Sequence, residues 1–302
     1  MAAAILHLLL LFLLSPLLLG VIGKTKACFA GRVGAPFLQP YFDILKLLRK
    51  GFVLSRTTTW VFIAGPVVAL VVPVVASLLI PFGALAAPLA FTGDLILFVY
   101  LFGLARFFTA AAALDTGSSF EGMGAAREVT YSCLAEPTVF FALIVLARLT
   151  GSFSLNGMLG PALAGQWPTG GAPLGLILVA LLVVLLVENS RIPFDDPNTH
   201  LELTMVHEVM VLDHGGPLFG LVLYGAAMKL FVLGSLLVGL VLPWRTGSLL
   251  ADTALFVIAM LLLAVLIGIV ESVMARLRLL RIPQMLIGTS LIAAFAMVLV
   301  LR

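Results

Sequence analysis

The chain has 302 residues, of which 62% are hydrophobic and only 10% are charged, with a formal net charge of +3. A soluble domain is nearer half apolar and a quarter charged, so this composition excludes an ordinary soluble enzyme and indicates a polytopic membrane protein. The two cysteines, Cys28 and Cys133, lie far apart without a metal-ligand spacing. This arrangement argues against both a disulfide framework and a zinc site.

The predicted fold class is all-α: one membrane domain over residues 1–302, with about eight transmembrane helices and an amphipathic helix on the cytoplasmic side. The predicted spans are residues 1–23, 60–80, 88–112, a stretch ending near 150, then 174–187, 218–242, 253–274 and 283–301. Residues 115–130 are predicted to form a glycine-rich polar turn, and residues 151–173 an uncharged outer loop.

The basic residues predict the orientation of the chain. Lysines follow the first apolar run and none precedes it, which is the reverse of a signal peptide, so we predict a retained span with its N-terminus outside. The positive-inside rule then puts the loops at residues 24–59 and 188–217 on the cytoplasmic side. Within the first loop, residues 36–50 place Phe42, Leu45 and Leu48 at helical intervals. This segment is an amphipathic helix that either lies on the membrane surface or also docks a soluble partner.

Several carboxylates fall within the predicted spans, where a charged side chain needs a partner or a wet cavity. Glu136 and Glu188 each lie beside a break in regular helix, so we predict that they belong to a proton path. Asp94 and Glu271 lie near span ends, where a structural ion pair is the more common role, and they are weaker candidates for the same path. Lys229 and Arg106 are the candidate counter-charges.

The three histidines His200, His207 and His214 are spaced by seven residues, which predicts one helix face. On a helix, seven residues separate two of them by roughly 10 Å, too far to share a metal ion. A proton relay, polar contacts to a docked protein and a solvated helix face remain open.

Two prolines, Pro193 and Pro197, flank Asp195 and Asp196, so the backbone is irregular at the membrane boundary. Irregular backbone at that depth requires protein or a water-filled cavity around it, and the spacing leaves a cavity and a protein interface open. Pro193 is expected to end the fifth span, with Glu188 and Arg191 in the last helical turn. The chain has no nucleophile elbow, phosphate-binding glycine loop or cysteine cluster, so any redox centres are expected in other subunits.

The acidic stretch over residues 188–217, ENSRIPFDDPNTHLELTMVHEVMVLDHGGP, closely resembles the membrane anchor subunit of group 4 membrane-bound NiFe hydrogenases, including formate hydrogenlyase. That subunit is similar to subunit 1 of respiratory complex I. Three supporting stretches extend the resemblance over nearly the whole chain: GRVGAPFLQPYFDILKLLRKG at 31–51, GMGAAREVTYSCLAEPT at 122–138 and RIPQML at 281–286.

The resemblance implies a noncatalytic membrane subunit that anchors a soluble electron-transfer arm and couples it to proton or sodium translocation. The implied partners are hydrogenase large and small subunits, a ferredoxin-like iron–sulfur subunit, antiporter-like membrane subunits and the lipid bilayer of a prokaryotic plasma (inner) membrane, with no nucleic acid. The implied cofactors, a NiFe centre and iron–sulfur clusters, belong to those partners. The residues assigned to the cytoplasmic cavity and docking surface are Arg32, Asp43, Lys46, Arg191, Asp195, Asp196, His200, Glu202, His207, Glu208, Asp213 and His214.

A quinone-site subunit of a complex I-like dehydrogenase is the main alternative. The respiratory motif has Asn and Leu where this chain has Ser190 and Asp196, and the added carboxylate makes the motif more polar. A stand-alone carrier is a third hypothesis, opposed by the lack of an internal repeat and by large charged inner loops.

Overall fold

The computed structural model describes residues 2–195 and 205–301. Within these residues the chain is helical, apart from loops and an isolated antiparallel bridge between Phe82 and Leu85. The predicted all-α fold is therefore confirmed. Three of the predicted site residues, Asp196, His200 and Glu202, lie outside the described residues.

In the described part of the chain, eight helices are long and apolar enough to cross a membrane. They are α1 (Ala2–Phe29), α3 (Trp60–Ser77), α4 (Asp94–Asp115), α5 (Ser119–Thr150), α8 (Trp167–Glu188), α9 (Gly216–Val241), α10 (Leu249–Val273) and α11 (Ile282–Leu301). The shorter elements are α2 (Gln39–Leu48), α6 (Leu155–Met158), α7 (Pro161–Ala164) and the 3-10 helices η1 (Glu208–Val211) and η2 (Leu279–Arg281).

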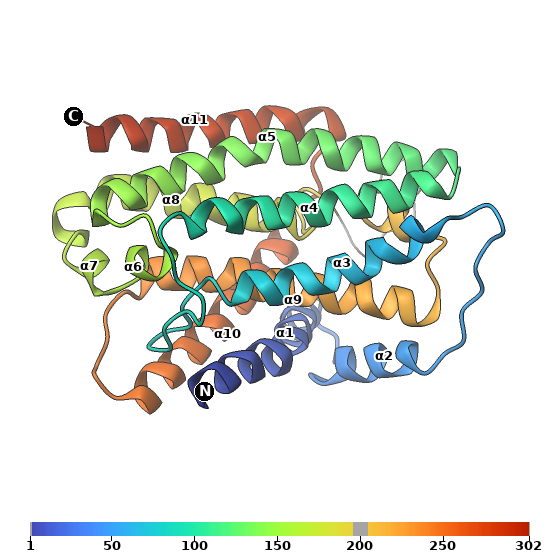
Figure 1. Cartoon of the computed structure of the whole chain (residues 1–302), viewed down its shortest axis with the longest axis horizontal. Coiled ribbons are helices and arrows are strands. Elements are labelled where there is room, and N and C mark those ends of the chain that lie inside the picture. Colours follow the sequence, from blue (N-terminus) through green and yellow to red (C-terminus); the bar gives the residue numbers. More distant parts are fainter. Residues whose placement is uncertain (1, 196–204, 302) are drawn as a thin grey trace.

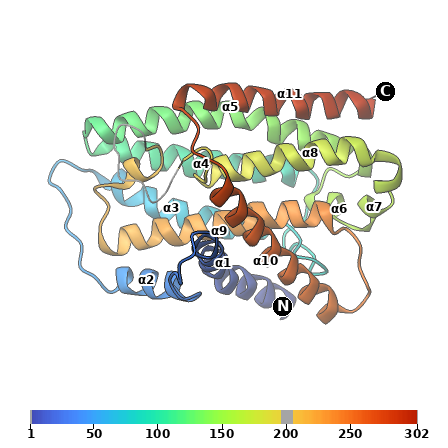
Figure 2. The ribbon, with the colours of Figure 1, turned by 180° about the vertical axis from the view of Figure 1, so that it is seen from behind.

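The long helices run roughly along one direction, with α5 and α11 side by side along one edge and α9 in the middle (Figure 1). From behind, α10 crosses the bundle obliquely beside α1 (Figure 2). We call the end that carries α2 and the α4–α5 turn the α2 end, and the end that carries α6 and α7 the opposite end. The predicted amphipathic helix is α2, which buries Ile44 and leaves Phe42 and Leu45 exposed.

Small residues let neighbouring helices approach closely, as is common in membrane bundles. A Cβ atom on Gly225 of α9 would lie 2.4 Å from the carbonyl oxygen of Ala69 in α3. A Cβ atom on Gly268 of α10 would lie 2.7 Å from the Cβ of Thr25 in α1. These two contacts fix the spacing of α3, α9, α10 and α1, which together surround the candidate site.

Two helices are longer than predicted. The first continues past residue 23 to Phe29, so that Lys24 and Lys26 lie on its last turns and not in a loop. The fifth helix begins at Ser119, so most of the predicted turn at 115–130 is helical. The prediction of a long turn was wrong because Gly124 serves close packing: a Cβ atom there would lie 2.3 Å from Val209 Cγ1.

The outer connection at residues 151–173 is also more ordered than predicted, since it contains α6, α7 and the start of α8. Asp94 begins α4 at the opposite end and is fully buried, and it organises this connection. Its carboxylate accepts hydrogen bonds from Ser154 Oγ at 2.7 Å and from the backbone N–H of Leu155 at 2.8 Å. Satisfied local donors explain how a carboxylate is buried in an apolar bundle.

Candidate functional site

Four charged side chains from four helices form an alternating row inside the bundle. Arg106 of α4 donates one hydrogen bond to Glu136 of α5 and another, at 2.5 Å, to Glu188 at the end of α8. Lys229 of α9 lies 2.8 Å from the second oxygen of Glu188. We call Glu136, Arg106, Glu188 and Lys229 the charge cluster. The sequence-based pairing of the two carboxylates with Arg106 and Lys229 matches this geometry.

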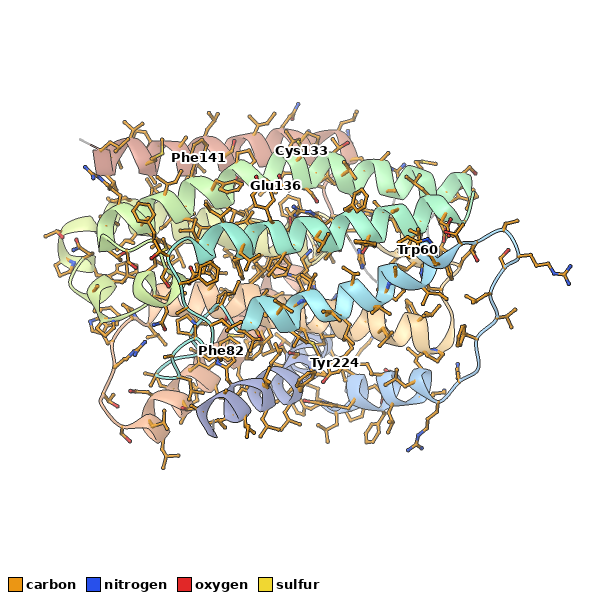
Figure 3. The ribbon with its side chains drawn as sticks, in the orientation of Figure 1. Trp60, Phe82, Cys133, Glu136, Phe141 and Tyr224 are labelled. Atoms are coloured by element: carbon orange, nitrogen blue, oxygen red, sulfur yellow. The ribbon has the colours of Figure 1, made fainter. Side chains whose placement is uncertain are left out.

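The charge cluster contains equal numbers of carboxylates and cations, which offsets the cost of taking charges out of water. The side chain of Glu188 is only 7% exposed, and it lies between two cations. The side chain of Glu136 is 41% exposed, although it lies about halfway along α5, between Cys133 and Phe141 (Figure 3). The cluster therefore runs from the interior of the bundle to its lateral surface.

Two cavities lie between the charge cluster and the α2 end. The small cavity has a volume of about 70 Å³, and its walls include Arg106, Glu188, Lys229 and Glu128. The large cavity has a volume of about 510 Å³ and lies between α1, α2, α9, α10 and η1. Five residues contribute to both walls: Asn189, Ser190, His207, Val222 and Ala226.

A buried carboxylate organises the wall of the large cavity. Glu271 of α10 has a fully buried side chain, 2.8 Å from Lys26 of α1 and 3.3 Å from Arg191. Asp43 of α2 and Glu208 of η1 also line this cavity. The large cavity is therefore a mixed site, with charged groups around its rim and apolar side chains of α1, α2 and α9 along its walls.

Arg191 lies outside helix α8, contrary to the prediction that it ends the helix together with Glu188. The helix ends at Glu188, and Ser190 has a positive φ of 50°. The Asn189 side chain donates to the carbonyl oxygen of Leu185 at 2.8 Å, which occupies an acceptor that the helix leaves open. The chain turns early enough for Arg191 to reach Glu271.

Asp195 is buried, with 3% of its surface exposed, so it is an internal anchor and not an exposed docking contact as predicted. One carboxylate oxygen lies 2.9 Å from Arg276, in the connection between α10 and η2. The other accepts hydrogen bonds at 3.1 Å from the backbone N–H groups of Val206 and His207. Asp195 thereby ties together three segments at the α2 end.

His207 and His214 do not share a helix face, so that prediction was wrong. His207 precedes η1 and lines both cavities. His214 follows η1, is buried, and stacks on Phe62 of α3 with ring centroids 4.0 Å apart. Its Nε2 lies 3.2 Å from the Phe62 carbonyl oxygen, so Nε2 carries the proton that is donated. The chain between the two residues is a short turn, because Asp195 takes the backbone N–H groups that begin it.

His214 is expected to make the protein less stable in acid. Burial lowers the pKa of His214, an effect that exceeds the opposing hydrogen bond to Phe62. The unfolded chain then binds the extra proton first, so stability falls as the pH drops below about 6.5, by at most about 1.4 kcal/mol per pH unit. Thermal unfolding in detergent at pH 7.5 and 5.5 should show a smaller drop for His214→Gln than for the wild type. Equal drops would contradict this assignment.

The remaining predicted site residues lie away from the charge cluster. Asp94 is at the opposite end of the bundle. Asp213 is exposed, and its backbone N–H donates to Glu121 at 3.1 Å. Arg32 and Lys46 are exposed and line neither cavity. Their proposed roles in a proton path or in docking stay predictions.

Glu128 was missed by the sequence analysis, although it lines the small cavity with Glu188. The predicted turn at 115–130 hid this residue. Ser118 and Glu121 have the spacing of a capping box, which would have predicted a helix start there. A helix from Ser119 places Glu128 four residues after Gly124 and four before Ser132, on the buried face of α5.

Metal binding finds no support in residues 2–195 and 205–301, where no group of three or more His, Cys, Asp or Glu side chains is arranged to hold an ion. The expectation that the NiFe centre and iron–sulfur clusters belong to partner subunits stays a prediction. The charge cluster and its cavities instead offer groups that can carry and exchange protons.

An eight-span helical bundle with charged side chains linked to a cavity defines a class of membrane protein, and sequence comparison gives its family. The family model described as NADH dehydrogenase matches residues 1–302. The chain belongs to this family, as a homologue of its subunit 1.

Individual relatives narrow this placement. The chain is 34% identical over 278 residues to formate hydrogenlyase subunit 4 of Escherichia coli (strain K12), covering 90% of this chain and 89% of that protein. It is 34% identical over 292 residues to hydrogenase-4 component C of the same organism, covering 94% and 90%. Identity to a membrane protein of Syntrophotalea carbinolica that belongs to its NADH-quinone oxidoreductase is 28% over 270 residues, covering 85% and 80%.

A solved structure shares the fold. A chain of the membrane-bound sulfane sulfur reductase, described as an archaeal respiratory membrane complex, superposes with a TM-score of 0.83. The match covers 99% of this chain and all of that chain, at 22% sequence identity.

Proposed function

We propose that this chain is a noncatalytic membrane subunit of a membrane-bound NiFe hydrogenase complex of the formate hydrogenlyase type. It anchors a soluble electron-transfer arm and couples that arm to proton or sodium translocation, as part of an oxidoreductase complex and without a redox centre of its own. The observation that carries the proposal is the charge cluster, which connects a cavity at the α2 end with the lateral surface of the bundle. The names of the two E. coli relatives support the type of complex.

The path begins in the large cavity, beside Lys26, Arg191 and Glu271. It continues through the small cavity to Glu188 and Arg106, and it ends at Glu136. Ionised and hydrogen-bonded groups along this line stabilise a moving charge inside a bundle that is otherwise apolar. Redox chemistry in a partner at the α2 end would then change the protonation of the cluster.

The exposed carboxylate of Glu136 supports a membrane partner on the α4–α5 face. A charged side chain at the centre of a span costs roughly 2.5–3.5 kcal/mol on insertion scales unless a partner or water faces it. An antiporter-like subunit with a polar group opposite Glu136 would cover this carboxylate. The hydrogenase large and small subunits and the ferredoxin-like subunit would dock at the α2 end.

Basic residues support the orientation. The α2 end carries Lys24, Lys26, Arg32, Lys46, Arg49, Lys50, Arg56, Arg127 and Arg276, whereas Arg148 and Arg245 lie toward the opposite end. The positive-inside rule puts the α2 end in the cytoplasm and the N-terminus outside. The membrane is then the plasma (inner) membrane of a prokaryote.

A quinone-site subunit is the second candidate function. The large cavity falls within the 300–1,000 Å³ usual for small-molecule sites and has apolar walls with a few polar groups. The relative from S. carbinolica, which is named as part of an NADH-quinone oxidoreductase, favours this alternative.

Purification of the tagged chain in mild detergent tests both candidates. The proposal predicts that the eluate contains partner subunits, nickel and iron, and that it takes up or evolves hydrogen. A nickel-free complex that reduces quinone would reject the hydrogenase proposal in favour of the second candidate. A lone intact chain without partners would reject both and favour a stand-alone carrier.

A further inference from the structure

His207 lies where the two cavities meet. Among the five residues shared by both walls in the described part of the chain, it is the one with a side chain that titrates. The charged groups of the large cavity and those of the charge cluster are otherwise separated by Asn189, Ser190, Val222 and Ala226. A proton that moves from one cavity to the other therefore passes the His207 ring.

The backbone of His207 is held in place by three neighbours. Its N–H group donates to Asp195 at 3.1 Å, and Asp195 is paired with Arg276 at 2.9 Å. Immediately afterwards, η1 packs on α5, where Gly124 leaves room for Val209. These contacts fix the position of the residue between the two cavities.

The surroundings of His207 favour its neutral form. Burial is the main cause that lowers the pKa of His207, and Lys229 lowers it further, whereas Glu208 and Asp195 raise it. The other charged groups of the two walls are Lys26, Asp43, Arg191 and Glu271 on one side and Arg106, Glu128 and Glu188 on the other. A neutral imidazole has one N–H donor and one acceptor nitrogen, the arrangement that a proton shuttle requires.

We propose that His207 is the proton-carrying residue between the large cavity and the charge cluster. One ring nitrogen takes a proton from water in the large cavity, and the other ring nitrogen releases its proton towards Glu128 or Glu188. Rotation of the ring restores the starting tautomer, so one proton enters and one leaves in each cycle. This inference rests on the proposed function, since it assigns one step of that translocation path.

The small cavity has room for the water that links the ring to the carboxylates. Its volume of about 70 Å³ exceeds the roughly 30 Å³ that one water molecule occupies in the liquid. Its walls supply charged partners in Glu128, Glu188 and Lys229. Water there can accept from the imidazole and donate to a carboxylate.

The test uses the intact complex purified with this chain and reconstituted into vesicles that contain a pH-sensitive dye. His207→Gln keeps a polar side chain but cannot become a cation. It is expected to lower proton translocation per electron transferred by about 100-fold or more, as for loss of a positioned proton-transfer group. Electron transfer by the soluble arm should continue. Added imidazole, which the large cavity can accommodate, should restore part of the translocation.

His214→Gln is the matched control, because His214 is also a buried histidine beside η1 but lines neither cavity. It should keep translocation. If His207→Gln pumps normally, or if imidazole restores nothing, the inference is overturned. Should that variant fail to assemble, His207→Asn gives the same reading with a smaller amide. Loss of translocation in His207→Gln and His214→Gln alike would indicate a structural role for the loop and would also overturn it.

Failure of this inference is distinguishable from failure of the proposed function. If Glu188→Gln stops translocation and His207→Gln does not, the path exists but bypasses His207. If neither variant changes translocation, the coupling role of the chain itself is rejected.

Discussion

Replacing Arg106 with methionine is expected to prevent stable assembly of the complex or to lower its thermal stability strongly. The guanidinium is the partner of both Glu136 and Glu188, so its loss leaves two carboxylates short of a counter-charge inside the bundle. Breaking a buried ion pair by removing one partner costs about 3–5 kcal/mol. Methionine keeps an unbranched side chain of similar length, so the change tests charge more than volume. The measurement is the yield of complex and its unfolding temperature in detergent.

Arg148→Met provides the control, because Arg148 is exposed on the last turn of α5. This variant should assemble with the yield and unfolding temperature of the wild type. Adding Glu136→Gln and Glu188→Gln to Arg106→Met should recover part of the lost stability, since neutral amides need no counter-charge. Wild-type stability in Arg106→Met alone would show that the guanidinium does not hold the cluster together.

The charge cluster was the part of the site most accessible from sequence. A carboxylate in an apolar span requires a partner, so Glu136 and Glu188 pointed to Arg106 and Lys229 before any geometry was known. The cost of an isolated charge limits the alternatives to the few cations in neighbouring spans. Amphipathic spacing likewise predicted α2, because burial of one face repeats at helical intervals.

The loop at the α2 end was less predictable because its conformation depends on tertiary contacts. A spacing of seven placed His207 and His214 on one helix face only if the helix continued between them. Asp195 instead accepts the backbone N–H groups of Val206 and His207, which begins a new short turn. Glycine was ambiguous in the same way: Gly124 looked like part of a turn, but it makes room for Val209 in the packing of α5.

The cavities could not be predicted from sequence, because their walls come from segments far apart in the chain. Lys26 of α1, Asp43 of α2 and Glu271 of α10 meet around the large cavity only after the bundle has formed. Local patterns carry no information on such distances. Glu128 entered the site for the same reason, since its importance follows from the cavity that it shares with Glu188.

Replacing Glu188 with glutamine is expected to abolish ion translocation while electron transfer and assembly persist. Glu188 is the one carboxylate of the charge cluster that contacts both Arg106 and Lys229, and it lines the small cavity. Glutamine keeps the shape and can accept hydrogen bonds from both cations, but it cannot bind and release a proton. Removing a positioned proton-transfer group costs about 100- to 10,000-fold in rate. The measurement is proton or sodium uptake by vesicles of the intact complex, relative to electrons transferred.

Glu121→Gln is the matched control for this last change. Glu121 is also a buried carboxylate on the α2 half of the bundle, but it lines neither cavity and accepts the Asp213 backbone N–H. Its replacement should leave the ratio of ions to electrons unchanged, even if the unfolding temperature falls. A normal ratio in Glu188→Gln would mean that the charge cluster holds the bundle together without carrying ions. Loss of translocation in Glu188→Gln alone would assign the path to the line from the large cavity to Glu136.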